Sequence, residues 1–207
     1  MIQKLQDNRA VLLGAVAIFA FGLTTSGYAL GDGLRRSKMA EHRTVTVMHG
    51  ALTFVPDTPA SDRVALANEL SSVLHTLYAG AFIRQTAKGP TPAPDDAPIR
   101  RIETMFTPAA RIALNQQAQV FRLGPHLDLL TGHVDYSGGM TRDRAQTTAL
   151  LSVHFTGTGS RTNEGIVVVT VDQSGQLTLQ RTAEGWSVRS FDLRITLKPP
   201  PPTPSPT

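Results

Sequence analysis

The chain has 207 residues, of which 41% are hydrophobic, and this length supports one sizeable core. The formal net charge is +4, but the cations are scattered and few aromatic residues lie between them, which disfavours a nucleic-acid surface. There is no cysteine, which excludes disulfides, thiolate nucleophiles and thiolate-bound zinc.

Residues 10–31 carry no charge, and residues 10–23 are the most apolar part of the chain. About 20 residues are needed to cross the hydrocarbon core of a bilayer, so this stretch predicts a transmembrane helix or signal anchor. The alternative is a secretory signal peptide, cleaved after Ala29 in the small-x-small sequence Gly27-Tyr28-Ala29. The predicted membrane-anchoring side chains are Val11, Leu12, Leu13, Val16, Ile18, Phe19, Phe21 and Leu23.

The charges that flank this segment leave its orientation open. Lys4 and Arg9 precede it, but more cations follow it, an asymmetry that favours a cytoplasmic location for the following domain. Large domains translocate largely regardless of such counts. We therefore expect a single-pass cell-membrane protein with residues 1–9 in the cytoplasm and the C-terminal domain extracytoplasmic.

Residues 32–56 read as a connector that includes a candidate strand at 43–56. Thr58-Pro59 fits a helix N-cap followed by proline, and apolar residues three and four apart then predict a long amphipathic helix that ends near Ile83. The proline-rich stretch 86–98 predicts a loop. A short helix is expected from Pro98, and a second clear helix over 109–121 follows Thr107-Pro108.

After residue 125 the apolar period changes to two, which predicts strands within 129–137, 145–155, 166–171, 176–181 and 184–197. Turns are expected at 138–144, 157–165 and 172–175. In the last strand Trp186 and Val188 have one parity and Phe191 has the other, so a bulge near Arg189-Ser190 is predicted. The pattern predicts an α+β domain at 57–197, with helices on a curved antiparallel sheet, and a disordered proline-rich tail at 198–207.

Two segments, "AQTTALLSVHF" (145–155) and "EGWSVRSFDL" (184–193), follow the helices in an order that resembles the SnoaL-like, nuclear-transport-factor-like cone fold. The resemblance implies that the last strand closes a curved sheet over the long helix, with Trp186, Val188 and Phe191 as structural anchors. On a single-pass anchor, such a domain resembles the Mce-associated membrane proteins of actinobacteria. It equally resembles the bitopic cone-fold subunit of conjugation and type IV secretion machines.

Enzymes of that fold place His, Asp or Tyr inside the cone mouth, and the nearest candidates are His133-x-Asp135 and His126-x-Asp128. A spacing of two puts both side chains of a pair on one face of a strand. His133 and Asp135 alternate with apolar Val134, so we expect them, like His154, to face solvent. The histidines show no grouping typical of a metal site. The sequence therefore predicts no catalytic, cofactor-binding or metal-binding residue.

These features together predict a non-catalytic assembly or scaffold subunit of a bacterial cell-envelope complex, in lipid import or in conjugation and secretion. The expected partners are other membrane or envelope proteins, and membrane lipid around residues 10–31, but no nucleic acid. Self-association is left open. The alternative is a secreted small-molecule-binding or enzymatic cone-fold domain, released by cleavage after Ala29.

Overall fold

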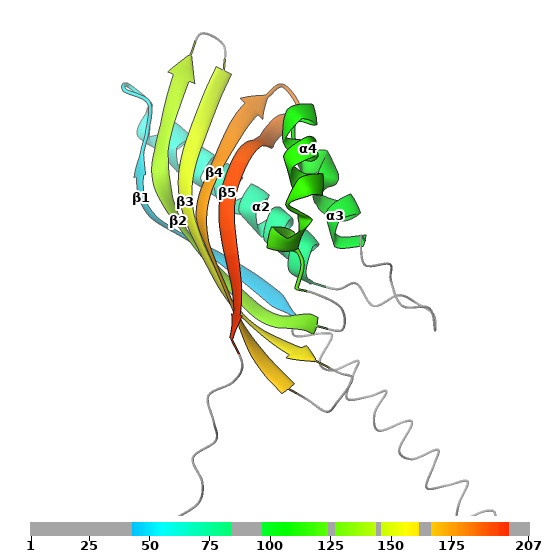
Figure 1. The fold of residues 1–207 in the computed structure, drawn as a ribbon. Helices are drawn as coiled ribbons and strands as arrows, with labels where there is room; N and C mark the ends of the chain where they lie inside the picture. The colour runs from blue at the N-terminus through cyan, green and yellow to red at the C-terminus, as the bar shows by residue number, and fades with distance from the viewer. Residues whose placement is uncertain (1–42, 84–96, 124–126, 144–145, 162–166, 199–207) are drawn as a thin grey trace, which may run out of the picture. The chain divides into compact units, whose positions relative to one another are not determined.

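The computed structural model describes residues 43–83, 97–123, 127–143, 146–161 and 167–198. They form a sheet and a group of helices (Figure 1). The elements, in chain order, are β1 (Thr44–Thr53), α2 (Ala60–Phe82), α3 (Ala97–Ile102), the short 3-10 helix η1 (Glu103–Met105), α4 (Pro108–Gln116), a second 3-10 helix η2 (Ala118–Phe121), β2 (Leu127–Asp143), β3 (Gln146–Arg161), β4 (Val167–Thr182) and β5 (Gly185–Lys198).

The five strands form one mixed sheet in the order β1-β2-β3-β4-β5. β1 runs parallel to β2, and the other neighbours are antiparallel. The α+β class is confirmed, but the expectation of a purely antiparallel sheet is wrong. Parallel neighbours need a crossover, and here the chain from α2 to η2 supplies it between β1 and β2.

β1 comes from the stretch expected to be a connector. Val45 is buried and Val47 is half-buried, whereas Thr44 and Thr46 are exposed. This alternation is typical of a strand with one face on the core. Residues 44–53 thus contribute an edge strand to the sheet, while the rest of the expected connector, up to residue 42, lies outside the described residues.

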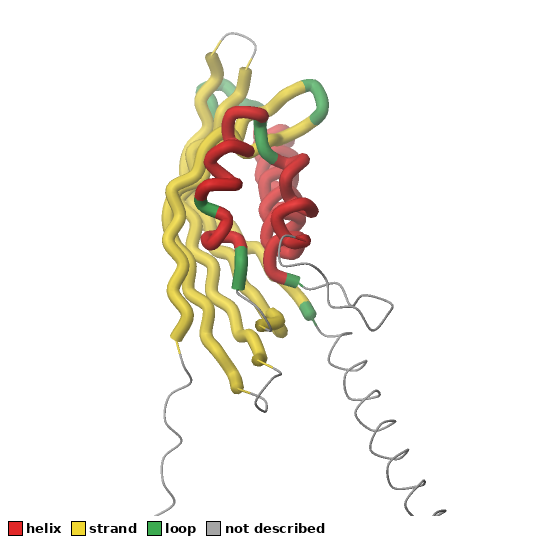
Figure 2. The backbone as a smooth tube through the Cα atoms, turned by 45° about the vertical axis from the view of Figure 1, so that its right-hand side comes forward, coloured by secondary structure: helices red, strands yellow, loops and turns green. Residues whose placement is uncertain are grey.

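The helices cover one face of the sheet, as Figures 1 and 2 show from two directions. α2 lies along this face and buries a stripe of residues three and four apart: Ala67, Leu70, Leu74, Leu77, Tyr78, Ala81 and Phe82. It ends at Phe82, with Ile83 as its C-cap, close to the predicted end near Ile83. Its N-cap is Pro59 rather than Thr58, because the Thr58 hydroxyl donates to the Val55 carbonyl at 2.6 Å instead of capping the helix.

The second predicted cap is confirmed. The Thr107 hydroxyl accepts from the Ala110 amide at 3.4 Å, and Pro108 occupies the first turn of α4. The helix itself is shorter than expected, because it ends at Gln116 and continues as η2.

β2 and β4 pass through two of the expected turns. Gly138 and Gly175 have φ values of 153° and 150°, and a Cβ at either position would lie within 2.1 Å of a carbonyl oxygen on the neighbouring strand. These glycines bend the strands without ending them, which curves the sheet. The sequence therefore predicted turns at these two glycines, whereas the structure has kinks within continuous strands.

The predicted bulge in β5 is confirmed. Val188 pairs with Leu179 and Ser190 pairs with Thr178, so Arg189 has no partner in the ladder. The extra residue changes the parity of the strand, so that Val188 and Leu193 are both buried.

Candidate functional site

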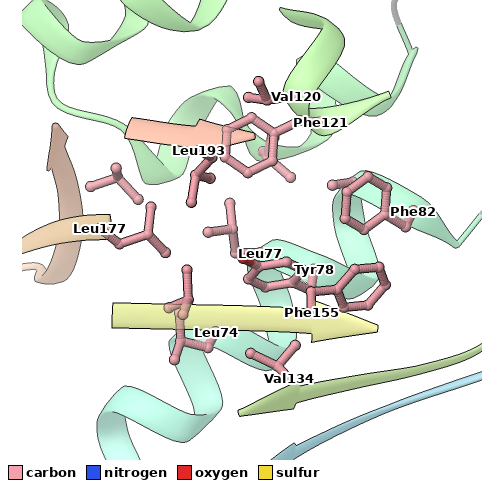
Figure 3. Close-up of a cluster of buried hydrophobic side chains, with 14 of the residues drawn as sticks. Leu74, Leu77, Tyr78, Phe82, Val120, Phe121, Val134, Phe155, Leu177 and Leu193 are labelled. Atoms are coloured by element: carbon pink, nitrogen blue, oxygen red, sulfur yellow. The ribbon is translucent and has the colours of Figure 1, made fainter. Parts of the chain in front are cut away.

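Aromatic side chains fill the space between α2 and the sheet. Phe155 from β3 stacks on Tyr78 and Phe82 from α2, with ring centroids 5.0 and 4.9 Å apart (Figure 3). Gly132 and Gly157 make room for this stack, since a Cβ at either would lie within 2.7 Å of a side-chain carbon of Phe155 or Leu129. The stack is therefore closely packed against the sheet.

A second aromatic group joins the helices to β5. Phe106, Phe121 and Phe191 meet edge to face, with centroids 5.5 to 5.8 Å apart. Phe106 and Phe121 are fully buried, and Phe191 is half-buried. Edge-to-face contacts of this kind stabilise a pair by about 0.5–1.5 kcal/mol beyond the area that they bury.

Gln173 on β4 is the single buried polar side chain among the described residues. Its Oε1 accepts from the Tyr78 hydroxyl at 2.8 Å, and its Nε2 donates to the Val120 carbonyl. Burial raises the pKa of the Tyr78 hydroxyl above its usual range, because the phenolate would lose its hydration. Tyr78 thus stays a neutral donor to Gln173, and the pair ties α2 and η2 to β4.

Tyr136 on β2 makes a second polar link to α2. Its hydroxyl donates to the Ala67 carbonyl at 3.0 Å and lies 2.9 Å from the Ser71 hydroxyl. Burial raises the pKa of Tyr136, and the hydrogen bond with Ser71 partly opposes that shift. A tyrosine hydroxyl that is hydrogen-bonded to two groups of the protein holds two elements together. It is not suited to exchange a proton with a substrate at neutral pH.

Glu69 makes the third link, at the other edge of the sheet. Its Oε2 accepts from the indole Nε1 of Trp186 at 2.9 Å, and its Oε1 accepts from Arg181 at 2.8 Å. Trp186 and Val188 are buried, so the expected anchor side chains of β5 lie against the helices. We refer to the Tyr78–Gln173, Tyr136–Ser71 and Glu69–Trp186 contacts as the helix–sheet clamps.

The predicted candidates for acid–base chemistry lie on the opposite, outer face of the sheet. His133 Nε2 is 3.0 Å from Asp135 Oδ1, and His154 Nε2 is 3.5 Å from Asp172 Oδ1. The side chains of His133 and His154 are 37% and 51% exposed, which agrees with the expectation that they face solvent. Lys198 also approaches Asp172, at 3.8 Å. Both pairs are therefore open to solvent rather than enclosed between α2 and the sheet.

Several predicted positions lie outside the described residues. His126 is one of them, as are the anchor segment 10–31, the candidate cleavage site after Ala29 and the tail from residue 199; for Asp128 only the backbone is described. Where the structure describes the chain, no helix is long and apolar enough to cross a membrane, and no three His, Cys, Asp or Glu residues converge as metal ligands.

Gln173 lies within the expected turn at 172–175, so the sequence did not indicate it as a buried polar residue. One signal was available, since Gln173 has the same parity as Val171 and Val169, both of which are buried. Glu69 and Ser71 were missed because each lies beside the apolar stripe of α2, where polar residues ordinarily mark the solvent side.

No family model, curated protein or solved structure matches the chain.

Proposed function

We propose that the protein is a non-catalytic assembly or scaffold subunit of a bacterial cell-envelope complex. Residues 10–31 hold it in the cell membrane, and the described domain lies outside the cytoplasm and contacts other envelope proteins. The cone-fold resemblance suggests two settings, lipid import or conjugation and secretion. The proposal that the protein is not an enzyme rests on one observation: buried side chains fill the space between α2 and the sheet.

The polar groups of the helix–sheet clamps on Tyr78, Gln173 and Tyr136 already have partners within the protein. Tyr78, Gln173 and Tyr136 hydrogen-bond to neighbouring helices or strands. General acid–base catalysis needs a titratable group within hydrogen-bond reach of a bound substrate. His133 and His154 are instead on the outer face of the sheet, in exposed pairs with aspartates. His49 of β1 is on the helix side, with its ring centroid 6.1 Å from that of Tyr136, but it is exposed at the edge of the sheet. This arrangement supports a domain that stabilises itself and presents its surface to partners.

The outer face of the sheet offers exposed polar side chains for contact with another protein. Ser137, Ser152 and Gln176 are neighbours across β2, β3 and β4, and the His–Asp pairs lie next to them. Such surfaces form hydrogen-bonded interfaces with modest apolar burial. A scaffold subunit would use this face without the deep pocket that a small ligand requires.

The test is recovery of partners from membranes. The full-length chain, tagged at its C-terminus and expressed in an actinobacterial host, is extracted in mild detergent and purified. We expect envelope proteins to co-purify in stoichiometric amounts. A matched chain without residues 199–207 shows whether the proline-rich tail contributes to binding, because unchanged recovery would mean that the partners do not bind through the tail.

The opposite result would be a protein in the soluble fraction, without stoichiometric protein partners and with a small molecule bound. Mass spectrometry of the same preparation detects both outcomes. That result would replace the scaffold function with the secreted ligand-binding alternative.

A further inference from the structure

The two edges of the sheet differ in how they are protected. On β5 the segment before α4 covers part of the edge, since Phe106 bridges to Val188 and the Thr107 amide donates to the Val188 carbonyl at 2.9 Å. The rest of β5 carries Asp192, Arg194 and Lys198. Charges, bulges and covering segments are the usual protection of an edge strand against pairing with another chain.

β1 has almost none of this protection. Within the described residues it pairs with β2 alone, so the hydrogen-bonding groups along its other edge have no strand partner. Residues 44–53 include no proline and no Asp, Glu, Lys or Arg, and His49 is the one ionisable side chain. The ladder is regular over 44–49 and becomes irregular between His49 and Leu52. A regular, uncharged edge of this kind pairs readily with another strand.

The outer face of β1 also exposes an apolar side chain. Thr46 and Met48 are paired with His133 and Asp135, so they lie on the same outer face as those residues, and Met48 is 56% exposed. A strand added beside β1 would contact Met48 directly, because side chains of adjacent strands are about 4.5–5.5 Å apart at Cβ.

Identical strands suit this edge. In a two-fold antiparallel pair, one residue faces its own copy, and the others pair symmetrically about it on the same face of the sheet. A pair centred on Thr46 sets Thr46 against Thr46, Thr44 against Met48, and Val45 against Val47. Cross-strand Thr–Thr pairs are favourable, and this register places no two charged side chains opposite each other. Residues 44–53 offer no Asp, Glu, Lys or Arg side chain with which a charged partner strand could form an ion pair.

We propose that two copies of this chain associate through their β1 strands, antiparallel and centred on Thr46, so that their sheets become continuous. The proposal depends on the described strands and is independent of the function proposed above. The interface covers Met48 and satisfies the outward backbone groups of residues 44–48.

Cross-linking tests the contact directly because the chain has no cysteine of its own. Thr46→Cys in the full-length chain, treated in membranes with a short bifunctional maleimide, is expected to give a covalent dimer. Thr196→Cys is the matched control, since Thr196 is also an exposed threonine but lies on β5 at the opposite edge. A dimer with Thr196→Cys but not with Thr46→Cys would contradict the proposal, as would no dimer with either.

A charge substitution provides a second, independent test. Thr46→Lys places two like charges opposite each other and is expected to raise the dimer dissociation constant at least about tenfold, whereas Thr196→Lys leaves it unchanged. Sedimentation of the detergent-solubilised full-length protein measures both values, and the fluorescence of Trp186 checks that each variant is folded. A wild-type monomer, or a dimer that is insensitive to Thr46→Lys, would overturn the proposal.

Discussion

Glu69 is the residue at which the long helix and the last strand are joined. It accepts hydrogen bonds from Trp186 and from Arg181, although the Glu69 and Arg181 side chains are 39% and 45% exposed. Solvent screens an ion pair with that exposure, so the pair contributes little to stability. The indole hydrogen bond, which is partly buried, is the stronger of the two interactions.

We therefore predict that Glu69→Ala lowers the free energy of unfolding by about 1–2 kcal/mol, chiefly through the lost indole partner. Trp186 is the single tryptophan in the chain, so its fluorescence reports the same change without interference. Urea denaturation followed by that fluorescence measures the loss. Glu184→Ala is the control, because Glu184 is exposed in the turn before β5; an equal loss in both variants would mean that the clamp contributes nothing.

Tyr78 gives the protein a dependence on alkaline pH. The unfolded chain releases this proton near pH 10, but the folded protein retains it to higher pH, so the unfolded state binds fewer protons and stability falls as pH rises. The stabilisation that comes from the raised pKa of Tyr78 is complete below about pH 10. Above that pH, the decrease in the free energy of unfolding approaches about 1.4 kcal/mol per pH unit for this group.

Tyr78→Phe is expected to reduce this alkaline loss while costing about 1–3 kcal/mol at neutral pH, because Gln173 Oε1 loses its donor. Denaturation at about pH 8 and about pH 11 separates the two effects. Tyr136→Phe is the comparison, since burial also raises the pKa of Tyr136. Identical pH slopes in the wild type and in Tyr78→Phe would contradict this account.

At the scale of elements, the curvature of the sheet depends on glycine kinks in β2 and β4. Gly175 pairs with Val153 on one side and Leu193 on the other, and Gly138 pairs with Leu151. The two kinks therefore lie close together across β3. A sheet bent along that line can follow the helices that it packs against.

Gly175→Ala is predicted to destabilise the protein by about 3 kcal/mol or more, because it combines an unfavourable φ with a Cβ 2.0 Å from the Asp192 carbonyl oxygen. Gly139→Ala is the control and should change stability by less than about 1 kcal/mol, since its Cβ would meet its nearest neighbour at 3.7 Å. Thermal or urea unfolding measures both. A mild effect at Gly175 would show that the kink is not required.

The elements also show what the sequence could predict. The helix of residues 60–82 and the bulge at Arg189 follow from the spacing and parity of apolar residues, which are local properties of the chain. The kinks at Gly138 and Gly175 were predicted as turns, because glycine marks both and only the neighbouring strand distinguishes them. Gln173 was missed for the same reason.

At the scale of the whole molecule, strand pairing was the least predictable feature. The alternation at residues 44–47 indicates a strand, but it does not specify which strand lies beside it or in which direction. The parallel pairing of β1 with β2 depends on how the intervening helices cross the sheet, which is a tertiary property. The predicted exposure of His133 and His154, by contrast, required only the parity of their strands.

We propose that the described domain is held outside the cytoplasm by an uncleaved segment at residues 10–31. The most direct measurement is the intact mass of the C-terminally tagged full-length protein from fractionated cells, combined with protease accessibility in spheroplasts. We expect a membrane-bound chain with its N-terminus intact and a domain that external protease can reach. A soluble product beginning at Leu30, or a domain that external protease cannot reach, would contradict it.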